Sequence, residues 1–166
     1  MENTHYVVYT MFSRSLEVMS KTFRRDLYGL RASGFPIEMV EPPVPDPLAV
    51  AQYSCLYWVD YLLDCDRGHT TNDLKDSGSV YQFLKTSYTF WLKAHSLMKS
   101  LPDGIVMVMK LENRIKVSHN VILSLLIWIS STKVLMYMRW NMMQNGLLYT
   151  IDWFSPPYLP KSPRTL

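Results

Sequence analysis

The hydrophobic residues of this chain recur at steps of three and four in three long stretches, which is the spacing of one face of an α-helix. The first stretch runs from about residue 4 to Leu30, the second from Asp46 to Asp64 and the third from Ser79 to Leu101. Their inward faces are Val8, Phe12, Leu16, Met19, Phe23, Leu27 and Leu30; then Leu48, Ala51, Cys55, Val59 and Leu62; then Val80, Phe83, Leu84, Ser87, Tyr88, Trp91, Leu92 and His95. The pattern predicts an all-α protein, a small bundle of four to five helices.

Local signals predict where two of these helices begin. Asp46 suits the N-cap of the second helix, and Pro47 follows at the first helical position, where its missing N–H costs nothing. Ser79 and Gln82 have the spacing of a capping box at the start of the third helix.

A shorter fourth helix is expected after a turn at residues 102–104. It runs from Ile105 to about Ile115, and its packed face is expected to hold Val106, Met109 and Asn113.

Two connections are expected to be non-helical. Residues 36–47 hold five prolines and two glutamates, which favours an extended, polyproline-like strap. Pro42, Pro43 and Pro45 superficially fit a ligand for an SH3-type domain, but no basic residue flanks them. Residues 65–78 are polar and rich in turn formers, so they predict a surface loop.

The aromatic residues indicate where the core lies. Trp58 and Trp91 are natural centres of a core shared by the second and third helices, together with Phe83. Tyr53, Tyr57, Trp58 and Tyr61 together widen the apolar stripe of the second helix into a broad aromatic surface. His95 lies on an apolar face, where a packing role is favoured over that of a base.

The sequence offers no catalytic or metal-binding pattern. It lacks a glycine-rich phosphate loop and the motifs HExxH, CxxC and GxSxG, so we predict no enzyme, no cofactor and no catalytic residue. The loop acids Asp64, Asp66, Asp73 and Asp76 lie near His69, but their spacing matches no calcium loop. Cys55 and Cys65 are expected to be small buried thiols rather than zinc ligands or a disulfide framework.

Charge argues against a nucleic-acid partner. Residues 1–109 carry ten Lys or Arg and twelve acids, whereas residues 110–166 carry seven and two. A nucleic-acid reader usually shows a denser basic face. The chain opens without the basic and apolar segments of a secretory signal, so a cytoplasmic location is the expectation.

The last third differs in composition from the rest. Residues 1–116 are predicted to form the helical domain and residues 117–166 a divergent tail, with an apolar part and a proline-rich end. Two apolar runs, Val121–Ile129 and Val134–Met138, are separated by a polar stretch that contains Lys133. Because a membrane-spanning helix needs about twenty apolar residues, insertion of Val121–Met138 is possible but not favoured.

Longer stretches carry a family resemblance. Residues 16–65, LEVMSKTFRRDLYGLRASGFPIEMVEPPVPDPLAVAQYSCLYWVDYLLDC, and residues 73–113, DLKDSGSVYQFLKTSYTFWLKAHSLMKSLPDGIVMVMKLEN, resemble fungal NACHT-domain proteins of the vegetative-incompatibility type. These are STAND signalling ATPases. The resemblance covers about residues 10–113, and it is to the helical region between the NACHT core and the C-terminal sensor repeats, usually WD repeats.

The resemblance implies a non-catalytic helical scaffold that contacts neighbouring NACHT or repeat domains of an intact relative. It also implies that this chain corresponds to one region of a larger protein, and we expect the chain to be a truncated gene product. Two alternatives stay open: a small membrane-associated protein anchored by Val121–Met138, and a remnant without function.

Overall fold

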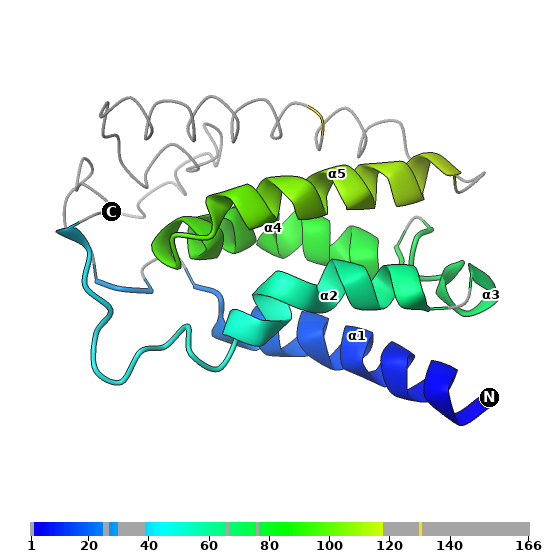
Figure 1. The fold of residues 1–166 in the computed structure, drawn as a ribbon, viewed down its shortest axis with the longest axis horizontal. Coiled ribbons are helices and arrows are strands. Elements are labelled where there is room, and N and C mark those ends of the chain that lie inside the picture. Colours follow the sequence, from blue (N-terminus) through cyan, green and yellow to red (C-terminus); the bar gives the residue numbers. More distant parts are fainter. Residues whose placement is uncertain are drawn as a thin grey trace, which may run out of the picture.

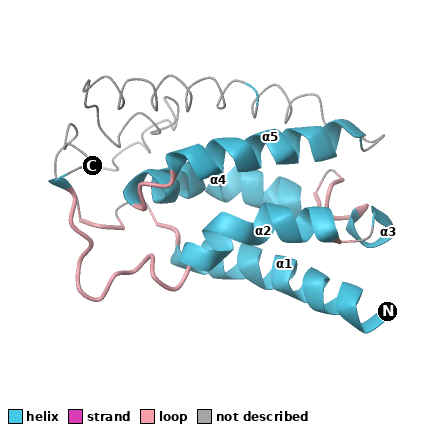
Figure 2. Ribbon diagram, viewed as in Figure 1, coloured by secondary structure: helices cyan, strands magenta, loops and turns pink. Residues whose placement is uncertain are grey.

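The computed structural model describes residues 2–24, 27–29, 39–65, 67–75, 77–117 and 130. Every regular element within them is a helix (Figures 1 and 2), as the hydrophobic pattern predicts. The helices are α1 (Glu2–Thr22), α2 (Gln52–Asp64), the single turn α3 (Arg67–Thr70), α4 (Ser79–Leu97) and α5 (Leu101–Val117). The prediction of a small all-α bundle is therefore confirmed.

Helix α2 is the centre of the bundle. It packs against α1, α4 and α5, and α4 also contacts α1 and α5. In Figure 1, α1, α2 and α5 lie side by side across the face shown, and α4 lies behind them. The short α3 and its loop lie at one end of the bundle, and the strap before α2 lies at the other.

The predicted aromatic core is confirmed. The ring centroids of Trp58 and Trp91 lie 5.8 Å apart with an edge-to-face geometry, and the Trp58 and Phe83 centroids lie 5.2 Å apart. Tyr88 adds a fourth ring to the cluster, with its centroid 5.6 Å from that of Trp91. Edge-to-face pairs add to the free energy that burial of the rings already supplies, so this cluster locks α2 against α4.

The first helix ends earlier than predicted, at Thr22 instead of Leu30. Its last backbone bond joins the Phe23 N–H to the Met19 carbonyl, 2.8 Å apart. Leu27 nevertheless lies in the core, because the chain turns back toward the bundle after the helix. Gly29 takes a φ of +62°, which a glycine adopts at little cost and which a helix cannot continue through.

The second helix begins later than predicted, at Gln52 rather than just after Asp46. Asp46 does cap a backbone N–H, because its Oδ1 accepts from Leu48 at 2.8 Å. In the turns that follow, backbone hydrogen bonds join residues three positions apart. The Ala51 N–H, for example, donates to the Leu48 carbonyl at 2.9 Å. Asp46 therefore caps a turn that is tighter than an α-helix. The first α-helical hydrogen bond, from the Cys55 N–H to the Ala51 carbonyl, forms only after this turn.

The prediction of a capping box at the start of α4 is wrong. The N-cap is Gly78, without a side-chain cap bond. The Ser79 hydroxyl donates to Oδ1 of Asp73 at 2.6 Å, so it is committed to the preceding loop. A tertiary contact has replaced the local one.

Helix α4 ends at Leu97 instead of Leu101, and α5 begins at Leu101, earlier than the predicted Ile105. The predicted face of α5 is also wrong, since Val106, Met109 and Asn113 are exposed. The buried hydrophobic residues of α5 are Leu101, Ile105, Met107, Val108, Leu111 and Ile115. They form a longer aliphatic stripe than the predicted one, and burying that stripe fixes the rotation of the helix.

No helix in the described part of the chain is both long and apolar enough to cross a bilayer. The predicted tail, residues 117–166, and with it Val121–Met138, falls outside the described residues apart from Val117 and Ser130. The Ser130 hydroxyl donates to Oε1 of Glu112 in α5 at 3.1 Å.

Candidate functional site

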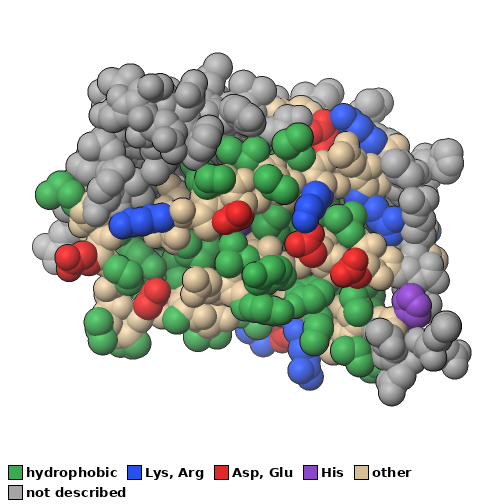
Figure 3. All heavy atoms as spheres, viewed as in Figure 1, with side chains coloured by type: hydrophobic (Ala, Val, Ile, Leu, Met, Phe, Trp, Pro, Cys, Tyr) green, Lys and Arg blue, Asp and Glu red, His purple; other side chains and the backbone are tan. Residues whose placement is uncertain are grey.

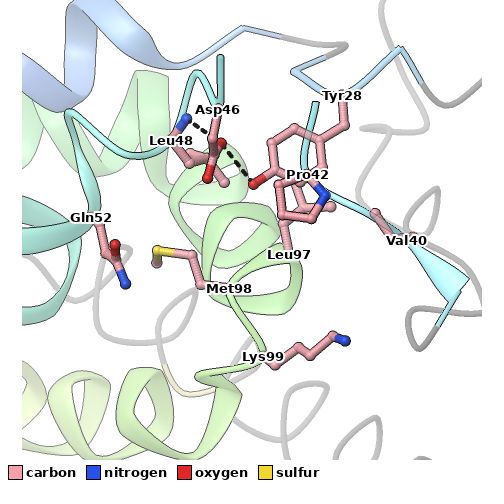
Figure 4. A pocket seen from close by; sticks show the side chains of 9 residues that line it. All are labelled: Tyr28, Val40, Pro42, Asp46, Leu48, Gln52, Leu97, Met98 and Lys99. Carbon is pink, nitrogen blue, oxygen red and sulfur yellow. Dashed lines mark hydrogen bonds between the residues drawn. The ribbon is translucent and has the colours of Figure 1, made fainter. Parts of the chain in front are cut away.

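A pocket of about 280 Å³ lies where the strap passes the C-terminal end of α4 (Figure 4). It is lined by Tyr28, Val40, Pro42, Asp46, Leu48, Gln52, Leu97, Met98 and Lys99. Its walls come from three parts of the chain that are distant in sequence: the segment after α1, the strap with the start of α2, and the end of α4. Sequence reasoning did not find it, because no local pattern brings these parts together.

The polar groups of this pocket are engaged with each other. Oδ1 of Asp46 accepts hydrogen bonds from the Tyr28 hydroxyl, at 2.9 Å, and from the Leu48 N–H (Figure 4). Burial, together with the bond to this carboxylate, raises the pKa of Tyr28 well above its ordinary value. A phenol held in its neutral form is a poor nucleophile, and no histidine or cysteine lines the pocket. The arrangement is suited to holding the strap in place.

His95 is fully buried, and it packs as the sequence predicts. Its ring meets Trp91 edge-to-face at 4.9 Å, and its Nδ1 lies 3.1 Å from the Ser100 carbonyl oxygen, to which it donates. Burial lowers the pKa of His95 to about 4, so the ring is neutral near pH 7. The Ser100 hydroxyl oxygen also lies 3.0 Å from Nδ1, and Nε2 has no hydrogen-bond partner. His95 joins the end of α4 to the turn before α5.

Both cysteines are free and buried, as predicted. Burial raises the pKa of the Cys55 thiol to about 12, and burial together with Asp73 and Asp64 raises the pKa of Cys65. Because the thiolate is the reactive form, neither residue is suited to nucleophilic chemistry.

The loop between α2 and α4 is organised by Asp73. Its carboxylate accepts from the Ser79 hydroxyl, and its backbone carbonyl accepts from the Val80 N–H at 3.1 Å. Burial, followed by the charge of Asp73 and a side-chain hydrogen bond to it, raises the pKa of Tyr9 in α1. The acid is therefore a structural tie between α1, the loop and α4.

The side chain of His69 and the residues Asp66 and Asp76 lie outside the described part. Among the described side chains, no group of three or more metal-ligating residues lies together. Pro42 borders the pocket, and Pro43 and Pro45 are exposed on the strap.

The aromatic residues of α2 divide into two sets, which the sequence analysis did not separate. Trp58 is buried, whereas Tyr53 and Tyr57 are 62% and 43% exposed and Tyr61 is half-buried. The three tyrosines recur every four residues, on the side of the helix away from the core stripe of Cys55, Val59 and Leu62. That offset in spacing is the signal that distinguishes them.

In the space-filling view, hydrophobic side chains gather over α2 in the middle of the face (Figure 3). The exposed side chains that belong to α2 and α5 include Tyr53, Tyr57, Val106 and Met109. Apolar groups exposed in this way are typical of a surface that meets another protein.

Comparison with known proteins gives one informative similarity. The chain is 46% identical over 110 residues to vegetative incompatibility protein HET-E-1 of Podospora anserina. The matched part is 64% of this chain but 8% of HET-E-1. No family model matches the chain, and no solved structure matches it. The chain is thus similar to a segment of a fungal vegetative incompatibility protein, and it spans under a tenth of that relative.

Proposed function

We propose that this chain is a non-catalytic helical scaffold, equivalent to a linking segment of a HET-E-1-like protein. The observation that carries the proposal is the 46% identity over 110 residues to HET-E-1, in a chain that folds as a helical bundle. The finer placement, between a NACHT nucleotide-binding core and C-terminal sensor repeats, rests on the family resemblance. The partners would be those neighbouring domains, in the cytoplasm.

The packing supports a scaffold role. Trp58, Trp91 and Phe83 join α2 to α4, and Lys110 of α5 forms an ion pair with Asp60 of α2 at 2.5 Å. A bundle tied together in this way transmits a displacement from one face to another as a rigid body, because packed cores resist gradual deformation.

The described residues also favour binding over catalysis. The buried histidine is committed to Ser100 and Trp91, the thiols are held in their neutral form, and the Asp46 carboxylate is bonded to the Tyr28 hydroxyl. The His95 ring and the Asp46 carboxylate are therefore engaged in structural hydrogen bonds, and the thiols are buried.

A segment exchange in HET-E-1 tests the proposal. The matched segment of HET-E-1 is replaced by the corresponding segment of this chain, and in a second protein by a Gly-Ser linker of equal length. We expect the exchange to preserve vegetative incompatibility and the linker to abolish it.

A third protein carries the exchanged segment with Trp58→Ala and Trp91→Ala, and it should behave like the linker because its core is broken. A linker protein as active as the exchange would overturn the scaffold role. Hydrolysis of ATP by the purified chain, with none in a control preparation that lacks it, would overturn its non-catalytic character.

A further inference from the structure

We propose that the exposed tyrosine face of α2 is a docking surface for a positively charged, arginine-bearing segment of a partner protein. The tyrosine face consists of Tyr53, Tyr57 and Tyr61. This inference rests on the proposed scaffold role, since it names the kind of partner that such a scaffold would contact.

The three tyrosines are ordered before any partner arrives. The ring centroids of Tyr53 and Tyr57 lie 4.7 Å apart, and those of Tyr53 and Tyr61 lie 6.3 Å apart. The Tyr61 hydroxyl donates to the Tyr53 hydroxyl at 2.6 Å. Side chains already held in one arrangement lose little entropy on binding, and tyrosine is one of the residues most enriched at binding hot spots.

The face extends from α2 onto α5. Asp60 lies one helical turn after Tyr57 and is joined to Lys110 of α5. Val106 is one turn before Lys110 on the same helix. Val106 is 51% exposed and Met109 is 46% exposed. The tyrosine rings and the ion pair therefore lie on the same exposed side of α2.

The charge of α2 selects the partner. The helix carries Asp60 and Asp64 and no lysine or arginine, and its last turn contains no basic residue. Asp64 thus closes the helix at the negative end of its dipole, where an acid is unfavourable and a cation is favoured. The basic residues of α5 that approach α2 are committed, Lys110 to Asp60 and Arg114 to the Thr70 hydroxyl at 3.0 Å.

Arginine satisfies both features of this surface at once. Its guanidinium stacks on tyrosine rings and pairs with carboxylates, whereas lysine does only the second well. An acidic segment would be repelled by Asp64, whereas the charge of Asp60 is already neutralised by Lys110. The partner is therefore expected to present arginine beside apolar side chains.

Binding of designed peptides to the full 166-residue chain tests this inference. The probe is a fluorescently labelled 18-residue helical peptide with leucine along one stripe and arginine beside it. Two matched peptides carry lysine or glutamate in place of arginine, and anisotropy measures affinity. We expect the arginine peptide to bind at least tenfold more tightly than the glutamate peptide, with the lysine peptide between them.

Variants of the chain locate the binding. The double variant Tyr53→Ser, Tyr57→Ser should weaken binding of the arginine peptide at least tenfold, and Asp64→Asn should weaken this binding severalfold. Tyr6→Ser, at a tyrosine of α1 that is 71% exposed, should change nothing and serves as the matched control. Circular dichroism checks that each variant keeps its helices.

Three results would overturn the inference: equal binding of the glutamate peptide, unchanged binding to the tyrosine variant, or tyrosine-dependent self-association or vesicle binding in place of peptide binding. If the HET-E-1 exchange works and the peptides fail, only the docking surface is wrong. If the peptides bind through the tyrosine face and the exchange fails, the scaffold role is wrong.

Discussion

The indole N–H of Trp91 in α4 donates a hydrogen bond to the backbone carbonyl of Cys55 in α2, 3.1 Å away, and both residues are fully buried. The bond connects residues 36 positions apart in the sequence. It fixes how far α4 can rotate about its axis relative to α2, and so it sets the geometry of the edge-to-face contact between Trp91 and Trp58.

Replacing Trp91 by phenylalanine keeps an aromatic ring but removes both the donor and part of the ring volume. We expect Trp91→Phe to destabilise the chain by about 2–4 kcal/mol in urea unfolding, since a lost buried hydrogen bond and a cavity act together. Tyr57→Phe, on the exposed face of α2, should cost less than about 0.5 kcal/mol. Equal effects of the two changes would contradict the arrangement of the core.

Gly78, at the start of α4, admits no side chain. A Cβ there would lie 2.3 Å from the Asn72 carbonyl oxygen and 2.4 Å from that of Asp73, both of which are backbone atoms. Gly78→Ala should therefore displace the loop and cost about 2 kcal/mol or more. Gly29→Ala is the comparison, because a Cβ at Gly29 meets nothing within 4 Å.

The cost of Gly29→Ala should come from its positive φ alone, about 1 kcal/mol. Thermal unfolding of both variants measures the difference. If Gly78→Ala were the milder change, the loop from Asn72 to Gly78 would not pack as described.

The buried position of His95 leads us to expect that the fold loses stability in acid. Its pKa of about 4 in the folded state lies below the ordinary value of about 6.5 in the unfolded chain, so the unfolded chain binds the proton more readily. Stability is thus unaffected by His95 above pH 6.5 and falls as the pH drops from 6.5 toward 4. The loss should approach about 3 kcal/mol.

His95→Asn keeps a donor near the Ser100 carbonyl but cannot titrate. It should lower stability at pH 7, because it removes ring contacts with Trp91, yet its stability should depend less on pH between 6.5 and 4.5. Denaturant unfolding at several pH values separates the two effects. Parallel pH profiles for the variant and the original chain would show that His95 is not the group responsible.

Asp46 couples the segment after α1 to the start of α2. Tyr28→Phe removes one bond to its Oδ1, whereas Asp46→Ala removes that bond and the cap on the Leu48 N–H. We expect losses of about 1 kcal/mol and about 2 kcal/mol. Because both changes break the same Tyr28 bond, the double variant should be about as stable as Asp46→Ala, which a double-mutant cycle in urea measures.

The positions of the helices in the sequence follow from local physics. The three-four spacing of apolar residues identified α1, α2 and α4, and the aromatic density around Trp58 and Trp91 identified the core, since burying such large rings outweighs most alternatives. His95 was interpreted correctly for the same reason: it shares the face of Trp91.

The errors lie at helix ends and on helix faces. Ser79 satisfies the local rule for an N-cap, but its hydroxyl bonds to Asp73 instead. Asp46 caps a backbone group as predicted, but of a turn and not of the helix. On α5, two alternative stripes exist in the sequence, and only the fit against α2 and α4 selects the one that contains Val108 and Leu111.

The sequence by itself thus determined the class of the fold, the approximate extent of its helices and the residues at the centre of its core, because helical periodicity and aromatic burial act over a few turns. Only the tertiary structure decided which stripe of α5 is buried, and that Tyr28, Asp46 and Met98 border one pocket. Those relationships depend on the rotation and mutual approach of whole helices. They are set by the packing of all the elements together and leave no mark within a single stretch of chain.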